Sequence, residues 1–432
     1  MPAVHGVDER PPPGPLIALA VQHVLVMYAG AVAVPLIVGG AYHLSKDQLA
    51  SLIDADLFAC GLATLVQSLG IGPFGIRLPV MMGASFVCVA PILAYAAQPG
   101  ATLGAVFGGV MLGGVFGVLI AQCAGTLVRL FPPVVTGSVI TVIGISLTNV
   151  AIGWAGGGVG AHDFGAPRYL GVAALVLVVI LLLLAWARGI ARNLAVLLGI
   201  VTGYALTIAL GWPSFAGLGG EPWIALVRPL SLAPPALVPS VTLAMCLAVI
   251  VTMIESTGMF LALTDIVGVP LTDRDLRRGL RADALGTLLG GFFNAFPYTS
   301  YSQNIGLVGI TGVRSRWVVV GGGVLLLALG VLPKLGFLVA SIPPSVLGGA
   351  GFVMFGMVAA TGIRVLANVD YTVRHNAVTV ALAISLGLVP TLSPHFFDAL
   401  PGWLAPIVDD GIVLAAAVAV ALDQFFRRFS MR

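Results

Sequence analysis

The chain has 432 residues, of which 59% are hydrophobic and only 9% are charged. Soluble globular domains carry about 25% charged residues, so this composition excludes a soluble protein and indicates an integral membrane protein. The net charge of +3 is small and comes from scattered arginines, which gives no reason to expect a nucleic-acid partner. The four cysteines form no CxxC pair, and we expect no metal site and no cofactor.

The first 15 residues contain several prolines and charged residues but no cleavage pattern, and we predict a short cytoplasmic tail. Apolar runs of about 20 residues then recur, the length needed to cross ~30 Å of hydrocarbon as helices. We predict about fourteen membrane segments. The first seven are Leu16–Gly40, Leu49–Gly70, Leu78–Ala97, Leu103–Leu130, Val134–Trp154, Tyr169–Ala187 and Leu194–Leu210. The other seven are Val241–Val267, Leu280–Phe296, Ser302–Thr311, Trp317–Leu332, Val346–Gly362, Thr372–Leu392 and Ala405–Phe425.

The distribution of basic residues supports an even number of segments and a cytoplasmic N-terminus. With this topology, sixteen Lys and Arg residues fall on the cytoplasmic side and four, Lys46, Arg168, Arg228 and Lys334, on the outer side. Cytoplasmic loops of membrane proteins are enriched in Lys and Arg. One missed span would place every later loop on the opposite side of the membrane and remove this bias. We therefore expect a multi-pass protein of the plasma (inner) membrane with both termini in the cytoplasm.

A short repeat indicates two inverted halves of seven segments. The fifth segment opens with Phe131-Pro-Pro-Val-Val-Thr-Gly137 and the twelfth with Ile342-Pro-Pro-Ser-Val-Leu-Gly348. The shared pattern PP-x-V-x-G recurs seven segments later, and an odd number of segments per repeat inverts the second copy. The third and tenth segments form another pair, and both are short and interrupted by Gly or Pro. Such paired broken segments mark the binding site of a transporter.

Glu255 lies in the middle of the eighth predicted segment, far from both of its ends. Ionisable side chains inside a bilayer are costly and mark substrate or proton pathways by default. We therefore identify Glu255 as the candidate proton carrier. The alternative is a protonated glutamate that only bonds its own helix.

Four further polar residues lie in or beside predicted segments. Asp283 lies near the start of the ninth segment and is either buried or near the cytoplasmic surface, and His23 lies within the first segment. Gln303 and Asn304 are adjacent amides at the break of the tenth segment, and an amide can both donate and accept hydrogen bonds. Gln303 is the better candidate for a ligand contact, because Asn304 can equally cap a helix.

Three other aspartates receive structural interpretations. Asp54 and Asp56 are expected near the outer end of the second segment, as part of a solvated helix start. Asp265 is expected at the membrane interface near the end of the eighth segment.

At Gln303-Asn-Ile-Gly-Leu-Val-Gly-Ile-Thr-Gly312 the chain resembles the nucleobase–ascorbate transporter family. The family signature is Gln or Glu, then Asn-x-Gly, four residues, Thr and a small or basic residue, and every fixed position matches. The segments Gln22–Gly30, Leu78–Phe86 and Ile254–Gly258 agree as well, so the resemblance covers nearly the whole chain.

The resemblance implies an all-α polytopic membrane protein of fourteen segments in two inverted repeats, with short strands in segments 3 and 10. After the tail of residues 1–15, a core domain combines residues 16–130 and 240–341, and a gate domain combines 131–239 and 342–432. It also implies alternating access by movement of core against gate, and a homodimer.

The resemblance assigns roles by position. Glu255 is implied to hydrogen-bond a nucleobase from the eighth segment and Gln303 from the tenth, with backbone groups at Phe86 and Ser302 completing the contacts. Asp283 and His23 are implied to act in proton coupling or in organising the site, and Asn304 to support Gln303.

Three positions depart from the family pattern. Met259 stands where many members carry Asp or His, which leaves the proton pathway open. Tyr301, counted among the substrate contacts, stands where Phe is common, and Ile305 replaces a frequent Asn. Both bear on substrate choice.

Gln at position 303 is similar to xanthine and urate permeases, whereas uracil transporters usually have Glu there. We therefore expect proton-coupled uptake of xanthine or urate. Uracil or broad nucleobase symport is the alternative substrate range. An anion exchanger would need a basic residue at the tenth-segment break, which has none. A membrane-embedded enzyme or a non-transporting receptor belongs to another class, and the scattered histidines and missing HExxH and GxSxG motifs speak against the enzyme.

Overall fold

The computed structural model describes residues 6–123, 125, 131–158, 160–401 and 404–430. The described chain is helical apart from one sheet of two short strands. The first half contains α1 (Pro13–Ala41), α2 (Lys46–Leu69), β1 (Met82–Ala84), η1 (Phe86–Cys88), α3 (Val89–Ala96), α4 (Leu103–Ile120), η2 (Ala121–Cys123), α6 (Pro133–Ala155), α7 (Pro167–Trp186), α8 (Ile190–Asn193) and α9 (Ala195–Ala209). The second half contains α10 (Pro239–Val267), α11 (Asp273–Phe292), β2 (Tyr298–Ser300), α12 (Ser302–Thr311), α13 (Arg316–Gly330), α14 (Pro333–Ala340), α15 (Pro344–Leu366), α16 (Arg374–Gly387), α17 (Val389–Leu392), α18 (Ala405–Val408) and α19 (Gly411–Ser430).

Eight helices in the described part of the chain are long and apolar enough to span a membrane, or nine if the bent pair α13–α14 is one span. The protein is thus a multi-pass membrane protein. This number is lower than the fourteen expected segments because several of those segments are not long apolar helices. α9 has 15 residues and α12 has 10, and α11 opens with a highly charged turn at Asp273. The third expected segment consists of β1, η1 and α3.

Local sequence signals fix where several helices begin. Ser45 caps α2 in a capping box with Gln48, and Thr272 caps α11 by accepting the backbone N–H of Asp275. Both satisfy amide groups that have no partner within the first helical turn. α6 and α15 each begin at the second proline of their PP motif, where the fixed φ of proline suits the first helical position.

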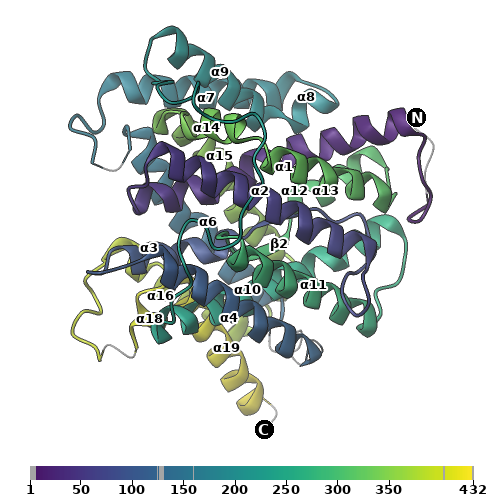
Figure 1. The fold of residues 1–432 in the computed structure, drawn as a ribbon. Helices are drawn as coiled ribbons and strands as arrows, with labels where there is room; N and C mark the ends of the chain where they lie inside the picture. Colours follow the sequence, from purple (N-terminus) through teal and green to yellow (C-terminus); the bar gives the residue numbers. More distant parts are fainter. Residues whose placement is uncertain (1–5, 124, 126–130, 159, 402–403, 431–432) are drawn as a thin grey trace.

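The helices pack in two groups that are interleaved along the chain (Figure 1). One group contains α1, α2, α4, α10, α11, α13 and α14, and the other contains α6, α7, α9, α15, α16 and α19. Contacts between the groups are fewer, and they include α10 with α6 and with α19. The largest cluster of buried apolar side chains spans both groups.

The two PP helices cross each other with matching contacts. A Cβ at Gly137, the last residue of the first motif, would lie 2.7 Å from the side chain of Leu366. A Cβ at Gly348, the last residue of the second motif, would lie 2.3 Å from the backbone of Ala155. Ala155 and Leu366 are the final residues of α6 and α15. Each motif glycine therefore lets its helix approach the end of the other.

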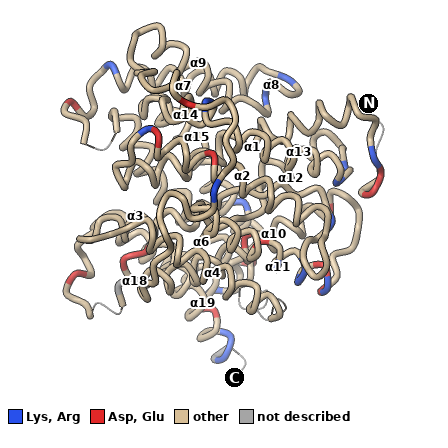
Figure 2. Tube along the Cα trace, in the orientation of Figure 1, with Lys and Arg blue, Asp and Glu red and all other residues tan. Residues whose placement is uncertain are grey.

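Charged residues are sparse over most of the trace and mark several of its ends (Figure 2). Arg192 lies in the last turn of α8, and Arg427 and Arg428 lie in the last turn of α19. At the N-terminal end, Arg316 at the start of α13 donates to Asp8 at 2.6 Å and to the carbonyl of Ser68 at 3.0 Å. This guanidinium therefore connects the tail, α13 and the end of α2.

Candidate substrate-binding site

The two strands meet in antiparallel register, with Met82 opposite Ser300, Gly83 opposite Thr299 and Ala84 opposite Tyr298. Each strand is tied to the helix that precedes it in the chain. The N–H of Met82 donates to Thr64 of α2 at 3.0 Å, and the N–H of Tyr298 donates to Thr287 of α11 at 3.1 Å. The expected pair of short strands is therefore confirmed, with β1 inside the third predicted segment and β2 just before the tenth. A threonine holds each strand in the same way.

The side chain of Tyr301 packs against β1. Its ring occupies the space where a side chain at Gly83 would stand, since a Cβ there would lie 1.6 Å from Cε2 of the ring. Its hydroxyl donates to the carbonyl of Ala84 at 3.0 Å. Tyr301 was predicted to contact the substrate. Its side chain is buried against β1, and the residue is the N-cap of α12.

α10 contacts each strand region through one hydrogen bond between two hydroxyl groups. Thr252 lies 3.2 Å from the hydroxyl of Ser85, just after β1, and Ser256 lies 3.1 Å from the hydroxyl of Thr299 in β2. These two α10 residues are one turn apart, and Glu255 lies between them in the sequence. The strand pair therefore fixes the part of α10 that carries Glu255.

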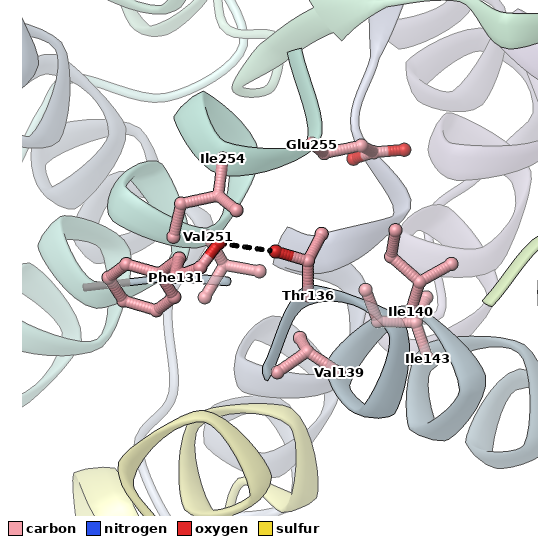
Figure 3. Close-up of a pocket in the computed structure, with 8 residues that line it drawn as sticks. All are labelled: Phe131, Thr136, Val139, Ile140, Ile143, Val251, Ile254 and Glu255. Atoms are coloured by element: carbon pink, nitrogen blue, oxygen red, sulfur yellow. Dashed lines mark hydrogen bonds between the residues drawn. The ribbon is translucent and has the colours of Figure 1, made fainter. Parts of the chain in front are cut away.

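Glu255 is half-buried at the contact between α10 and α6, where it lines a small cavity. Figure 3 shows its carboxylate directed away from Ile254 and Phe131, above Thr136 and Ile140 of α6. No hydrogen bond to this carboxylate occurs among the described residues. The cavity volume is about 10 Å³, room for about one water molecule, whereas ligand pockets usually measure about 300–1,000 Å³. The two helix groups are therefore closed against each other beside Glu255.

Phe86 faces the other helix group. It begins η1, is half-buried, and makes an edge-to-face contact with Phe355 of α15, with ring centroids 5.6 Å apart. Phe355 in turn contacts Trp154 of α6 at 6.4 Å. Apolar rings from α6 and α15 therefore cover Phe86, two residues after the end of β1.

The adjacent amides of α12 have different surroundings. Asn304 is fully buried, and its Nδ2 donates to the His23 carbonyl at 2.9 Å and lies 3.1 Å from Nδ1 of His23. Gln303 is exposed, and among the described residues its amide has only a 3.4 Å hydrogen bond from the hydroxyl of Ser302. Asn304 therefore fastens α12 to α1, while the amide of Gln303 remains available to a ligand. The half-buried Ser302 is the first residue of α12.

Asp283 is buried in α11, which resolves the two placements left open by the sequence. Its Oδ1 accepts a hydrogen bond of 2.7 Å from Gln67 of α2. Gln67 also donates to the carbonyl of Gly279 and accepts from the N–H of Ile76.

The expectation of a solvated helix start at Asp54 and Asp56 is wrong. Both side chains are buried, Asp56 completely and Asp54 with 6% of its surface exposed. Asp56 accepts a hydrogen bond of 2.9 Å from the hydroxyl of Tyr298 in β2. The aspartates lie beyond the first turn of α2, where neighbouring elements cover them. Asp265 is exposed near the end of α10.

Several structural residues of the site were not identified from the sequence. They are the hydroxyl and amide side chains that hold the strands and the buried aspartates, namely Thr64, Gln67, Thr252, Ser256, Thr287, Tyr298 and Thr299. The sequence offered one signal for Thr64 and Gln67, because both are polar residues within an apolar segment. These residues and their hydrogen-bonded partners lie up to 242 residues apart in the sequence, as Tyr298 and Asp56 do. No local sequence pattern reveals such pairs.

Comparison with known proteins identifies the relatives of this chain. Residues 14–396 match the model of the Permease family of xanthine/uracil permeases. The chain is 50% identical to the uric acid transporter UacT of Escherichia coli over 425 residues, covering 98% of this chain and 88% of the relative. It is 41% identical to the xanthine permease of Bacillus subtilis over 417 residues, covering 96% and 95%.

Solved structures share the fold. The transmembrane domain of the cyanobacterial bicarbonate transporter BicA superimposes with a TM-score of 0.65 at 16% identity, covering 95% of this chain and 96% of that one. The murine anion transporter Slc26a9 in an inward-facing state gives a TM-score of 0.64 at 12% identity, covering 98% and 69%. At these identities the likeness concerns the fold alone.

Proposed function

The chain belongs to the xanthine/uracil permease family, and we propose that it carries urate or xanthine across the cell membrane together with a proton. The family makes it a transporter and not an enzyme. Support for the substrate comes from the relatives at 50% and 41% identity, which are a uric acid transporter and a xanthine permease. Gln303 supports it too, because its neutral amide can pair with the imide edge of a purinedione without adding a second acid.

The observation that carries the proposal is that two polar side chains near the strand pair have few or no hydrogen-bond partners within the protein. The carboxylate of Glu255 has no hydrogen-bond partner among the described residues, and the amide of Gln303 has only its neighbour Ser302. Ser256 follows Glu255 directly, and Ser300 lies three residues before Gln303. The N–H of Ser300 donates to the Ser256 hydroxyl at 3.4 Å. Glu255 and Gln303 thus belong to elements that are held together, which suits two-point recognition of a base.

The remaining predicted residues complete the proposed site. Backbone groups at Phe86 and Ser302 contact the base, and Tyr301 shapes the strand pair beside it. Asp283 and His23 organise the site. Gln67 holds Asp283, and Asn304 connects His23 to α12, so neither residue needs to touch the substrate.

Transport proceeds in this proposal by movement of a core domain against a gate domain. The core comprises residues 16–130 and 240–341 and the gate residues 131–239 and 342–432, in two inverted repeats of seven segments. The interleaved helix groups and the matching PP helices support this division. The cavity of about 10 Å³ beside Glu255 cannot hold a purine, so the two domains must separate there to admit one.

Glu255 is the proposed proton carrier. One proton moving through 100 mV releases about 2.3 kcal/mol, which supports roughly fifty-fold accumulation of a neutral substrate. Both termini lie in the cytoplasm in this proposal, as the distribution of Lys and Arg indicates. We also propose that the protein works as a homodimer, on the resemblance to its family.

The test is uptake of radiolabelled urate and xanthine into proteoliposomes with an imposed pH gradient, acid outside. The wild-type protein should accumulate at least one of them, and unlabelled purines should compete better than uracil. Glu255→Gln should abolish the response to the gradient, because it replaces the carboxyl group that can bind and release a proton by a neutral amide.

Asp265→Asn is the matched control, since Asp265 is an exposed acid on the same helix and should leave uptake unchanged. Uptake that ignores both the gradient and Glu255→Gln would remove the proton mechanism. Uptake of uracil in preference to both purines would overturn the substrate assignment.

A further inference from the structure

A second and larger cavity lies away from Glu255, beneath the long segment that joins α9 to α10. This segment, residues 212–238, is called the strap. It crosses α2 in Figure 1. Backbone hydrogen bonds tie it to the first helix group, from Ala225 to Val331 at 3.1 Å, from Leu230 to Phe292 at 3.1 Å and from Ala236 to Gly104 at 2.8 Å. The strap is therefore a fixed cover and not a loose connection.

The cavity has a volume of about 230 Å³, enough for several water molecules. Its floor is formed by the first half of α2, and its walls by the end of α11 and the bend between α13 and α14. Residues 221–232 of the strap form its cover. None of the residues proposed to bind the nucleobase lines it.

Asp54 lines this cavity without a hydrogen-bond partner. Its side chain is 94% buried, and its fully buried Oδ1 has no partner in the described part of the chain. A Cβ at Gly336 of α14 would lie 2.3 Å from this oxygen, so any larger residue at position 336 would collide with the carboxylate. A buried carboxylate without a partner is costly as an anion, and it therefore calls for a proton or a cation beside it.

The other charges that line the cavity favour a cation. Asp47 of α2 and Glu221 of the strap also line it, and Arg228 is the only basic residue that does so. Glu221 therefore lines the same cavity as Asp54, from the side of the strap. No salt bridge joins Arg228 to any of the three acids among the described residues. A surface with an excess of acids and low-dielectric walls concentrates cations.

The arrangement also indicates how such a cation is held. Within the described residues no three His, Cys, Asp or Glu side chains come close enough to hold a metal ion by themselves. A cation here must therefore keep much of its water shell, for which the cavity has room. Hard cations such as Na⁺, Mg²⁺ and Ca²⁺ accept carboxylate, carbonyl and water oxygens together.

We propose that the cavity under the strap is a second binding site, which takes a small hydrated inorganic cation held by Asp54 of α2 and faced by Glu221 of the strap. A cation at this place joins α2 to the strap and so stabilises that part of the first helix group. The site is separate from the proposed nucleobase site, and its occupancy does not depend on a bound base.

The test measures cation binding to the purified full-length protein in detergent, without nucleobase. Na⁺, K⁺, Mg²⁺ and Ca²⁺ are compared with choline at constant ionic strength, by thermal unfolding and by equilibrium binding of radioactive Na⁺ and Ca²⁺. At least one of the four cations should raise Tm in a saturable way that choline does not. Asp54→Asn should weaken this cation by about tenfold or more, because it removes the central carboxylate ligand.

Glu221→Gln provides a second variant in case Asp54→Asn does not fold, because Glu221 lies on the strap and is half-buried. It should weaken the same cation severalfold while leaving Tm in choline unchanged. Asp265→Asn, an exposed acid outside the cavity, should have no effect. The proposal is overturned if no cation exceeds choline in the wild type, or if binding survives both Asp54→Asn and Glu221→Gln. Urate uptake, measured separately, tests the transport function.

Discussion

At the scale of single residues, the polar side chains inside the helices divide into two sets. One set has protein partners, as in the pairs Asp283–Gln67 and Asn304–His23. The other set has no such partners among the described residues, apart from the contact of Gln303 with Ser302, and it includes Glu255, Gln303 and Asp54. Buried polar groups such as Asp54 normally find hydrogen bonds within the protein, whereas Glu255 is half-buried and Gln303 is exposed, so both can be reached by a solute. The uncommitted groups are therefore the ones expected to meet a ligand.

The hydrogen bond from Tyr298 to Asp56 gives the first prediction at this scale. Tyr298→Phe removes the hydroxyl that donates to the completely buried Asp56 at 2.9 Å. Leaving a buried acceptor without its partner costs about 1–3 kcal/mol, so Tm should fall by several degrees in detergent. Tyr371→Phe, at an exposed tyrosine, is the control, and an equal Tm for both variants would show that the bond is unimportant.

Gly83 gives a second prediction. A Cβ at this position would lie 1.6 Å from the Tyr301 ring, so Gly83→Ala must displace the ring and break its hydrogen bond to Ala84. We expect urate affinity to fall by more than about tenfold, the loss of roughly one good contact. Gly40→Ala, at a glycine with no atom within 4 Å of the added Cβ, should bind like the wild type. Normal urate binding by Gly83→Ala would show that Tyr301 does not shape the site.

The sequence identified Glu255 because it lies mid-segment, where any acid is conspicuous. It misplaced Asp54 and Asp56 because they lie closer to a segment end, where solvent exposure is the ordinary expectation. Their burial depends on Tyr298 and Gly336, which are more than 200 residues away in the sequence. Position along one helix cannot reveal such partners.

At the scale of elements, the broken segments were found because Gly and Pro interrupt apolar runs. The strands themselves have three residues each, too few for any periodicity, and their expectation came from the family resemblance. The PP motifs were visible in the sequence, and the structure shows what they do. They start two helices whose motif glycines lie against the ends of the partner helices.

The crossing of α6 and α15 gives the third prediction. A Cβ at Gly144 of α6 would lie 2.2 Å from the backbone N of Ala359, and backbone cannot yield as a flexible side chain does. Gly144→Ala should therefore destabilise the protein by about 1–3 kcal/mol, as overpacking does, and lower Tm. Gly153→Ala, on the same helix with open space around the added Cβ, should leave Tm unchanged or raise it. Equal Tm values would contradict the close crossing.

The start of α13 gives the fourth prediction. Arg316 is buried and donates to the carbonyls of Ser68 and Leu69 at the end of α2 as well as to Asp8. Arg316→Ala should lower the free energy of unfolding by about 1–3 kcal/mol, because it leaves buried helix-end carbonyls unpaired. Asp8→Asn should cost about 1 kcal/mol or less, since Asp8 is exposed. A larger loss from Asp8→Asn would place the stabilisation in the tail instead.

At the scale of the whole molecule, composition alone established a multi-pass membrane protein, because few charged residues are available to cover a soluble surface. The PP-x-V-x-G repeat suggested two inverted halves, and the described helices pack in two groups that each take helices from both halves. In the sequence the strap is only the stretch left between the seventh and eighth predicted segments. Its hydrogen bonds to α4, α11 and α13 attach it to the first group, so we expect it to move with the core during transport.

The central claim is that Glu255 and Gln303 together hold a purine between the two helix groups. An experimental structure of the protein with bound urate or xanthine tests it most directly. We predict a planar ligand within hydrogen-bonding distance of the Glu255 carboxylate and the Gln303 amide, in a space opened by separation of α10 from α6. A base bound elsewhere, with no contact to either side chain, would contradict it.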